Sequence, residues 1–107
     1  MKEPVPLLID TDPALGVTVD DRPHDVDDAW ALVQAANDPA LALRGVTVVY
    51  GNAPLPLARE SAERLEALDA LRCPVVAGAA GPLKEDPDPA AADWLADVLR
   101  EGPARIA

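Results

Sequence analysis

Three short apolar runs, separated by segments of helical periodicity, constrain the fold of this chain more than any other feature. The runs cover residues 5–9, 43–50 and 74–77, and each is too short for a helix and contains β-branched residues. Because nearly continuous apolar strands that alternate with helices are typical of parallel sheets, the pattern predicts an α/β fold. We expect a mostly parallel, open, Rossmann-like sheet in three layers, with right-handed connections.

The intervening segments 27–37, 57–71 and 91–100 carry apolar residues at the spacing of amphipathic helices. Residues 105–107 resemble the beginning of a fourth strand. With 107 residues, the chain is expected to form one domain at most, covering residues 1–107 and breaking off after about three strand–helix units. The side chains expected to face the sheet are Ala29, Trp30, Leu32, Val33 and Ala36 in the first helix, Leu57, Ala58, Ala62, Leu65 and Leu68 in the second, and Trp94, Leu95, Val98 and Leu99 in the third.

The composition excludes several classes of function. A formal net charge of −10, with only two lysines, argues against binding to nucleic acid or to an anionic membrane. It favours a cation or a neutral substrate as the partner. No apolar run of about 18 residues and no signal-peptide core occurs, so we expect a cytoplasmic protein. Cys73 is the single cysteine, which excludes an internal disulfide and predicts a small buried apolar residue.

Aspartates crowd the stretch between the first strand and the first helix. Residues 10–32 contain seven aspartates and no glutamate, and because like charges repel one another, such a cluster predicts a cation site or a site that activates water. Asp10 and Asp12 end the first strand, and Asn52 follows the second. Since ligands gather beyond the carboxyl ends of parallel strands, these side chains are expected to converge on one rim of the sheet.

A sulfur-free cluster of carboxylates suits a hard cation, Ca²⁺ or Mg²⁺, better than zinc. Asp12 on the loop and Asp27 and Asp28 at the helix start would provide ligands from two elements. A bound divalent ion lowers the pKa of a coordinated water, and a neighbouring aspartate can then accept the proton. The alternative is that Asp27 and Asp28 are ordinary first-turn acids that interact with the helix dipole.

Two further residues of this stretch have open roles. Asp25 is a candidate N-cap for the helix that begins near residue 27. His24 is either a solvent-facing loop residue or a general acid. Asp20-Asp21 competes with Asp27-Asp28 for the site, but only the latter pair continues into a helical sequence, Ala29 to Leu32.

Four sequence segments together resemble the nucleoside hydrolase family. They are Asp10-Thr11-Asp12-Pro13, Asp27-Asp28-Ala29, GVTVVYGN at residues 45–52 and PVVAGAAGPL at residues 74–83. The family usually has only a couple of residues between the first two segments. Here the thirteen residues 14–26 separate them, as in a variant pattern with D-T-D-P-A-L-G and a later D-V-D-D.

The resemblance implies a role for each matching residue. Asp12 would be a Ca²⁺ ligand and the base that activates water, Asp28 a metal ligand, and Asp27 a ligand of the ribose hydroxyls and of the metal. Asn52 would contact the ribose, and Asp10 would support the loop through backbone N–H groups. The implied reaction is hydrolysis of the N-glycosidic bond of a ribonucleoside through an oxocarbenium-like transition state, as part of nucleoside catabolism or of purine and pyrimidine salvage.

The resemblance covers only the N-terminal portion of the family, whose members are nearly three times as long. Further metal ligands, asparagines for the ribose and a histidine near the leaving base would lie downstream in them. The resemblance therefore implies a chain with little or no activity of its own, and its status as an enzyme stays open. Family members usually form dimers or tetramers, which leaves homo-oligomerisation as an expectation.

Two other readings remain. In a haloacid dehalogenase-like phosphatase, Asp10 would be the nucleophile, Asp12 the acid–base and Mg²⁺ the metal. That reading lacks the expected threonine at Ala14 and leaves Asp27, Asp28 and Asn52 without a role. The second alternative is a non-catalytic fragment or interaction module that keeps an acidic loop without chemistry.

Overall fold

A parallel four-stranded sheet forms the centre of the protein. The computed structural model describes residues 2–82, 85 and 90–107. The strands run in the order β5-β4-β1-β6, and each neighbouring pair is parallel. Their bounds are β1 Val5–Thr11, β4 Leu41–Val48, β5 Val75–Ala77 and β6 Arg105–Ile106.

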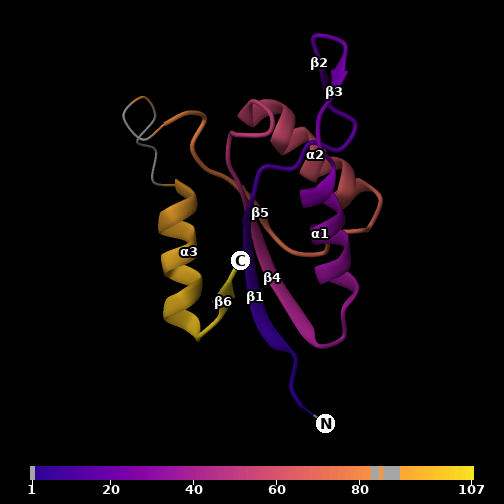
Figure 1. Cartoon of the computed structure of the whole chain (residues 1–107). Coiled ribbons are helices and arrows are strands. Elements are labelled where there is room, and N and C mark those ends of the chain that lie inside the picture. The colour runs from indigo at the N-terminus through magenta and orange to yellow at the C-terminus, as the bar shows by residue number, and fades with distance from the viewer. Residues whose placement is uncertain (1, 83–84, 86–89) are drawn as a thin grey trace.

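Helices cover both faces of this sheet (Figure 1). α1 (Asp27–Asn37) and α2 (Leu55–Ala67) lie on one face, and α3 (Ala90–Glu101) lies on the other. The predicted three-layer, parallel α/β architecture is thereby confirmed, and the predicted helices differ from the observed ones by only a few residues at their ends. No described helix is long and apolar enough to cross a membrane.

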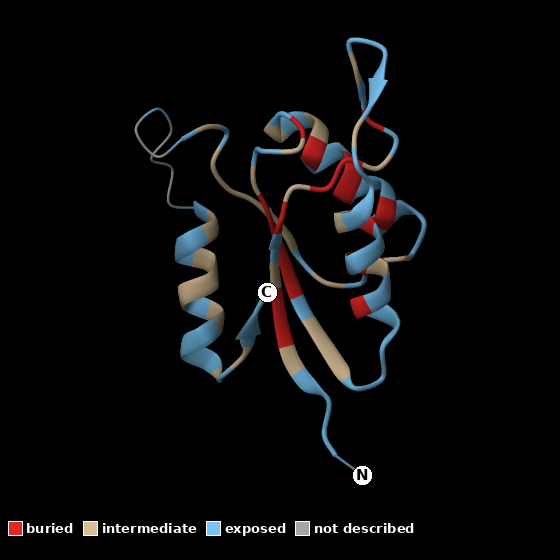
Figure 2. Cartoon of the chain, in the orientation of Figure 1, coloured by how far each residue is buried: buried red, intermediate tan, exposed pale blue. Residues whose placement is uncertain are grey.

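The main core lies between the sheet and the α1–α2 layer, where most buried residues gather (Figure 2). It forms because small and branched side chains at helical spacing pack on the β-branched face of β4. α3, in contrast, has no buried residue among those described. It contacts the sheet through Trp94, whose ring lies over Gly45 of β4, and through Ala91, which lies close to Gly78 after β5. The buried members of the main core are Ala29, Leu32, Val46, Val48, Ala58, Ala62, Leu65 and Leu71.

Several residues expected to face the core are exposed instead. Trp30 is 70% exposed and Leu68 is 73% exposed, while Ala36 and Leu99 are also classed as exposed. The buried face of α1 is narrow and consists of Ala29, Leu32 and Ala35. The prediction that Trp30 and Ala36 also face the sheet was therefore wrong. Leu68 lies beyond the last residue of α2 and therefore leaves the helix face.

Cys73 is half-buried and packs against the main core. Burial raises the pKa of its thiol. This agrees with the expected role of Cys73 as a small apolar residue.

A small hairpin within residues 14–26 was not anticipated. Its strands are β2 (Thr18–Val19) and β3 (Arg22–Pro23), which pair antiparallel. The two residues of the turn, Asp20 and Asp21, have φ values of 51° and 59°. Positive φ at both central positions is the conformation of a type I′ hairpin turn, which Asp tolerates better than most residues do. Glycine is the usual signal for this turn, and its absence concealed the hairpin in the sequence.

The start of α1 also differs from expectation. Val26 occupies the N-cap position and no side chain caps the helix, so the predicted cap at Asp25 was wrong. Asp27 and Asp28 occupy the first turn. Their charge complements the helix dipole there. The side chain of Asp28 also accepts a hydrogen bond from Thr11 at the end of β1.

Candidate active site

The end of β1 is joined to the start of α1 by the carboxylate of Asp28. The hydroxyl of Thr11 donates a 2.5 Å hydrogen bond to Asp28 Oδ2, and the backbone N–H of Asp12 donates to the same oxygen at 3.1 Å. Thr11 faces α1 because alternate residues of a strand point to opposite faces, and Ile9 packs on the same α1–α2 layer. The result is that Asp12 and Asp28 lie side by side.

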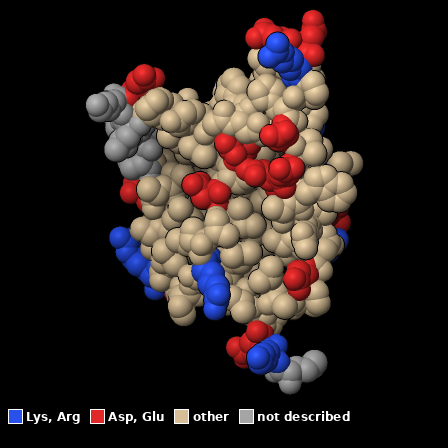
Figure 3. Space-filling view, viewed as in Figure 1, with Lys and Arg blue, Asp and Glu red and all other residues tan. Residues whose placement is uncertain are grey.

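The turn that follows β4 also contributes to the site. The backbone N–H of Asn52 donates a 2.7 Å hydrogen bond to Oδ2 of Asp12, 40 residues earlier in the chain. Acidic side chains gather on this rim, above the carboxyl ends of the strands in Figure 3. The predicted convergence of Asp12 and Asn52 therefore occurs, and it follows from the parallel pairing of β1 with β4.

The two neighbouring carboxyls differ in their affinity for protons. Burial raises the pKa of Asp12, and the hydrogen bond with Asp28 raises it further. The Thr11 hydroxyl, followed by the hydrogen bond with Asp12, lowers the pKa of Asp28. Of the two carboxyls, Asp12 therefore binds a proton more readily than Asp28 does.

Comparison with known protein families agrees with this geometry. The family model described as inosine-uridine preferring nucleoside hydrolase matches residues 7–99, which is most of the chain. The chain belongs to the nucleoside hydrolase family. Neither the curated proteins nor the solved structures provide a match.

Other acids of this member of the nucleoside hydrolase family lie apart from the Asp12–Asp28 pair. Asp27 is exposed, because successive helix residues point about 100° apart and only Asp28 faces β1. Asp10 accepts a 2.7 Å hydrogen bond from the buried hydroxyl of Thr47 on β4. Asp10 thus links two strands, whereas support of the loop through backbone N–H groups was expected.

The described part of the acidic rim does not by itself form a complete metal-binding group. Within residues 2–82, 85 and 90–107, no three Asp, Glu, His or Cys side chains are grouped so that they could hold a metal ion. The carboxylates of Asp12 and Asp28 suit a hard cation in chemical type and charge, but alone they would provide fewer oxygens than the six to eight that Ca²⁺ takes. Of the three aspartates expected to share one metal ion, the structure brings Asp12 and Asp28 together, whereas Asp27 is exposed.

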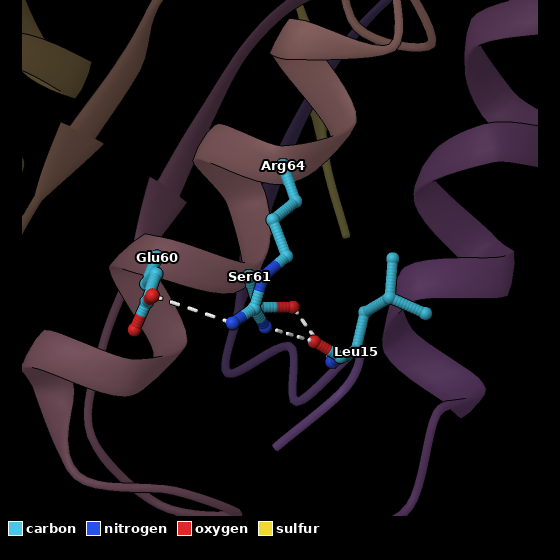
Figure 4. A network of polar contacts seen from close by, with 4 residues as sticks. All are labelled: Leu15, Glu60, Ser61 and Arg64. Atoms are coloured by element: carbon cyan, nitrogen blue, oxygen red, sulfur yellow. Dashed lines mark hydrogen bonds and ion pairs between the residues drawn. The ribbon is translucent and has the colours of Figure 1, made fainter.

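The loop that follows Asp12 is fastened to α2 (Figure 4). The fully buried hydroxyl of Ser61 accepts a 2.7 Å hydrogen bond from the N–H of Leu15, and Nη1 of Arg64 donates to the Leu15 carbonyl at 2.7 Å. Arg64 also pairs with Glu60. Sequence analysis did not identify these residues or Thr11, since a lone Ser, Thr or Arg in a helix or strand carries no local signal for such contacts.

Proposed function

We propose that this chain carries the catalytic carboxylates for hydrolysis of the N-glycosidic bond of ribonucleosides. The observation that supports this most directly is the placement of the Asp12 and Asp28 carboxylates side by side at the end of β1, where backbone N–H groups of Asp12 and Asn52 hold them. Family membership supplies the substrate class. The proposal extends to nucleoside catabolism or to purine and pyrimidine salvage in the cytoplasm, and to self-association of the chain.

In this proposal Asp12 is the general base. Its raised pKa makes it a better proton acceptor than an ordinary carboxylate, and a proton taken from water could be shared at once with Asp28. The N–H of Asn52 holds Oδ2 of Asp12 in a fixed position, which leaves its other oxygen for the water. Such pre-positioning lowers the reorganisation needed during the reaction.

The negative charge of the pair would also stabilise the substrate as it reacts. Cleavage of an N-glycosidic bond develops positive charge on the sugar, and nearby carboxylates stabilise an oxocarbenium-like transition state. The hydrogen bond that Thr11 donates favours the ionised form of Asp28. Asn52 is proposed to contact the ribose, and Asp27 to bind the ribose hydroxyls or the metal, as the family resemblance implies.

Asp12 and Asp28 are the residues proposed to hold Ca²⁺, with Asp27 as the third candidate. The ion, when bound, supplies a coordinated water of lowered pKa. Two adjacent carboxylates repel one another, and a cation between them removes that repulsion. Thermal stability should therefore rise with millimolar Ca²⁺ in the wild-type chain and less in Asp28→Asn.

The function is tested by incubating the purified chain with inosine or uridine and Ca²⁺, and by measuring released ribose and nucleoside-dependent thermal stability. We expect slow hydrolysis that Asp12→Asn reduces by at least about 100-fold, the scale of a lost general base. Asp20→Asn, at the tip of the hairpin, is the matched control and should retain the wild-type rate.

The proposal fails if neither ribose release nor the nucleoside-dependent rise in melting temperature depends on Asp12 or Asp28. Hydrolysis of p-nitrophenyl phosphate that requires Asp10 and Mg²⁺ would instead identify a phosphatase. In the structure Asp10 accepts a hydrogen bond from Thr47 on β4. A chain that binds neither Ca²⁺ nor nucleoside would be a non-catalytic module.

A further inference from the structure

Residues 14–26 are built into the rim of the candidate site. Ala14 and Val17 are buried against Ala53, the residue next to Asn52, in a small hydrophobic cluster separate from the main core. The N–H of His24 donates to the Val17 carbonyl at 3.1 Å and closes the base of the hairpin. The segment that separates the two halves of the aspartate motif is therefore packed against the turn that holds Asp12.

Asn52 connects this segment to the catalytic carboxylate through three different groups. Its backbone N–H donates to Asp12 Oδ2 at 2.7 Å, and its side-chain amide donates to the Asp25 carbonyl at 2.8 Å. Its carbonyl oxygen is bonded to Nδ1 of His24. The only side chain of the segment that contributes to this connection is the His24 ring, since Asp25 uses its main chain.

The bond between His24 and Asn52 fixes the protonation of one ring nitrogen. A carbonyl oxygen can only accept, so Nδ1 of His24 carries a proton and donates it. This bond selects the tautomer whose proton is on Nδ1. His24 can therefore hold the turn through this one donated bond.

We propose that His24 is a positioning residue, which fixes the Asn52 turn and through it the Asp12 carboxylate. The consequence for hydrolysis rests on the proposed function, whereas the coupling of the three residues rests on the contacts alone. The ring acts through Nδ1, and no proton is transferred from it during the reaction. The segment 14–26 thus replaces the short connection usual in the family with one that braces the general base.

The test compares His24→Ala with His24→Asn. The amide nitrogen of asparagine lies where Nδ1 of histidine lies relative to the backbone, so the asparagine side chain can restore the bond without an ionisable ring. Asp25→Asn is the matched control, because it removes a neighbouring charge but leaves the main-chain bond to Asn52. Hydrogen exchange of the Asn52 amide is measured, with amides of β4 as the reference for global unfolding.

In His24→Ala we expect the Asn52 amide to exchange about fivefold faster, the effect of losing one hydrogen bond, with the β4 amides unchanged. His24→Asn and Asp25→Asn should stay within about twofold of the wild type. If His24→Ala leaves the Asn52 amide unchanged, or if His24→Asn behaves like His24→Ala, the positioning role is wrong.

Hydrolysis separates the positioning role from acid–base catalysis. His24→Ala should lower kcat with little change in KM or in the shape of the pH profile, and His24→Asn should restore kcat. Loss of activity in His24→Asn together with loss of a limb of the pH profile would overturn the proposal in favour of proton transfer by the ring. If the wild type neither hydrolyses nor binds a nucleoside, the proposed function fails, and the exchange data still decide the coupling.

Discussion

A Cβ atom built on Gly51 would lie 2.1 Å from Oδ2 of Asp12, so the Asp12 carboxylate occupies the space that a side chain at position 51 would need. Gly51 also has a φ of 154°, which side chains disfavour. The turn after β4 and the loop after β1 are therefore complementary in shape. This contact makes glycine a requirement of the candidate site.

Replacing Gly51 with alanine should displace the Asp12 carboxylate and break its bond with Asn52. We expect a loss of about 1–3 kcal/mol in the free energy of unfolding, the usual cost of inserting a methyl group into a packed site. Urea denaturation measures this loss. Gly102→Ala is the control, since nothing lies within 4 Å of a Cβ there. Equal stability of the two variants would contradict the close contact at Gly51.

Asp12→Asn should stabilise the metal-free protein at neutral pH. Because the pKa of Asp12 is raised in the folded state, its contribution to stability is present at low pH and is lost as pH rises through that value. Asparagine removes the repulsion from Asp28 and can still accept from Asn52. After solvent screening we expect a gain on the order of 0.5 kcal/mol. Thermal melts at pH 7 should show this gain, and it should vanish at pH 3.

Thr11→Val should destabilise the protein at neutral pH. The Thr11 hydroxyl is the main cause of the lowered pKa of Asp28, so it contributes stability above the unfolded-state pKa that is lost as pH falls through the folded-state value. Asp28 is partly exposed, and we expect a cost of about 1 kcal/mol at pH 7 that shrinks in acid. Thr11→Ser keeps the hydroxyl and should remain close to the wild type in urea denaturation at both pH values.

Two arginines on α2 provide a matched test of how the Asp12 loop is held. Arg59 and Arg64 each pair with a glutamate four residues away on the helix, but only Arg64 also donates to the Leu15 carbonyl. Arg64→Gln should therefore cost about 1 kcal/mol more than Arg59→Gln. It should also accelerate exchange of the Leu15 amide. Identical unfolding curves and exchange rates for the two variants would show that Arg64 does not hold the loop.

The sequence identified the parts of this site that depend on local patterns. The order of strands and helices followed from apolar periodicity, and the placement of Asp12 and Asn52 at one rim followed from parallel strands with shared carboxyl ends. The approximate ends of α1 and α3 were likewise accessible, because proline and glycine interrupt the chain near them. These features depend on residues close in sequence or on a general rule of sheet topology.

The contacts between distant residues could not be obtained in this way. Which of Asp27 and Asp28 faces β1 depends on the rotation of α1 about its axis, and packing of Ala29 and Leu32 in the main core sets that rotation. The bond between His24 and Asn52 likewise exists because a hairpin without a glycine signal folds back onto the turn after β4. The sequence alone thus determined which chemistry reaches the rim, whereas tertiary packing decided which carboxylates meet, because orientation about a helix axis is fixed by contacts that periodicity does not encode.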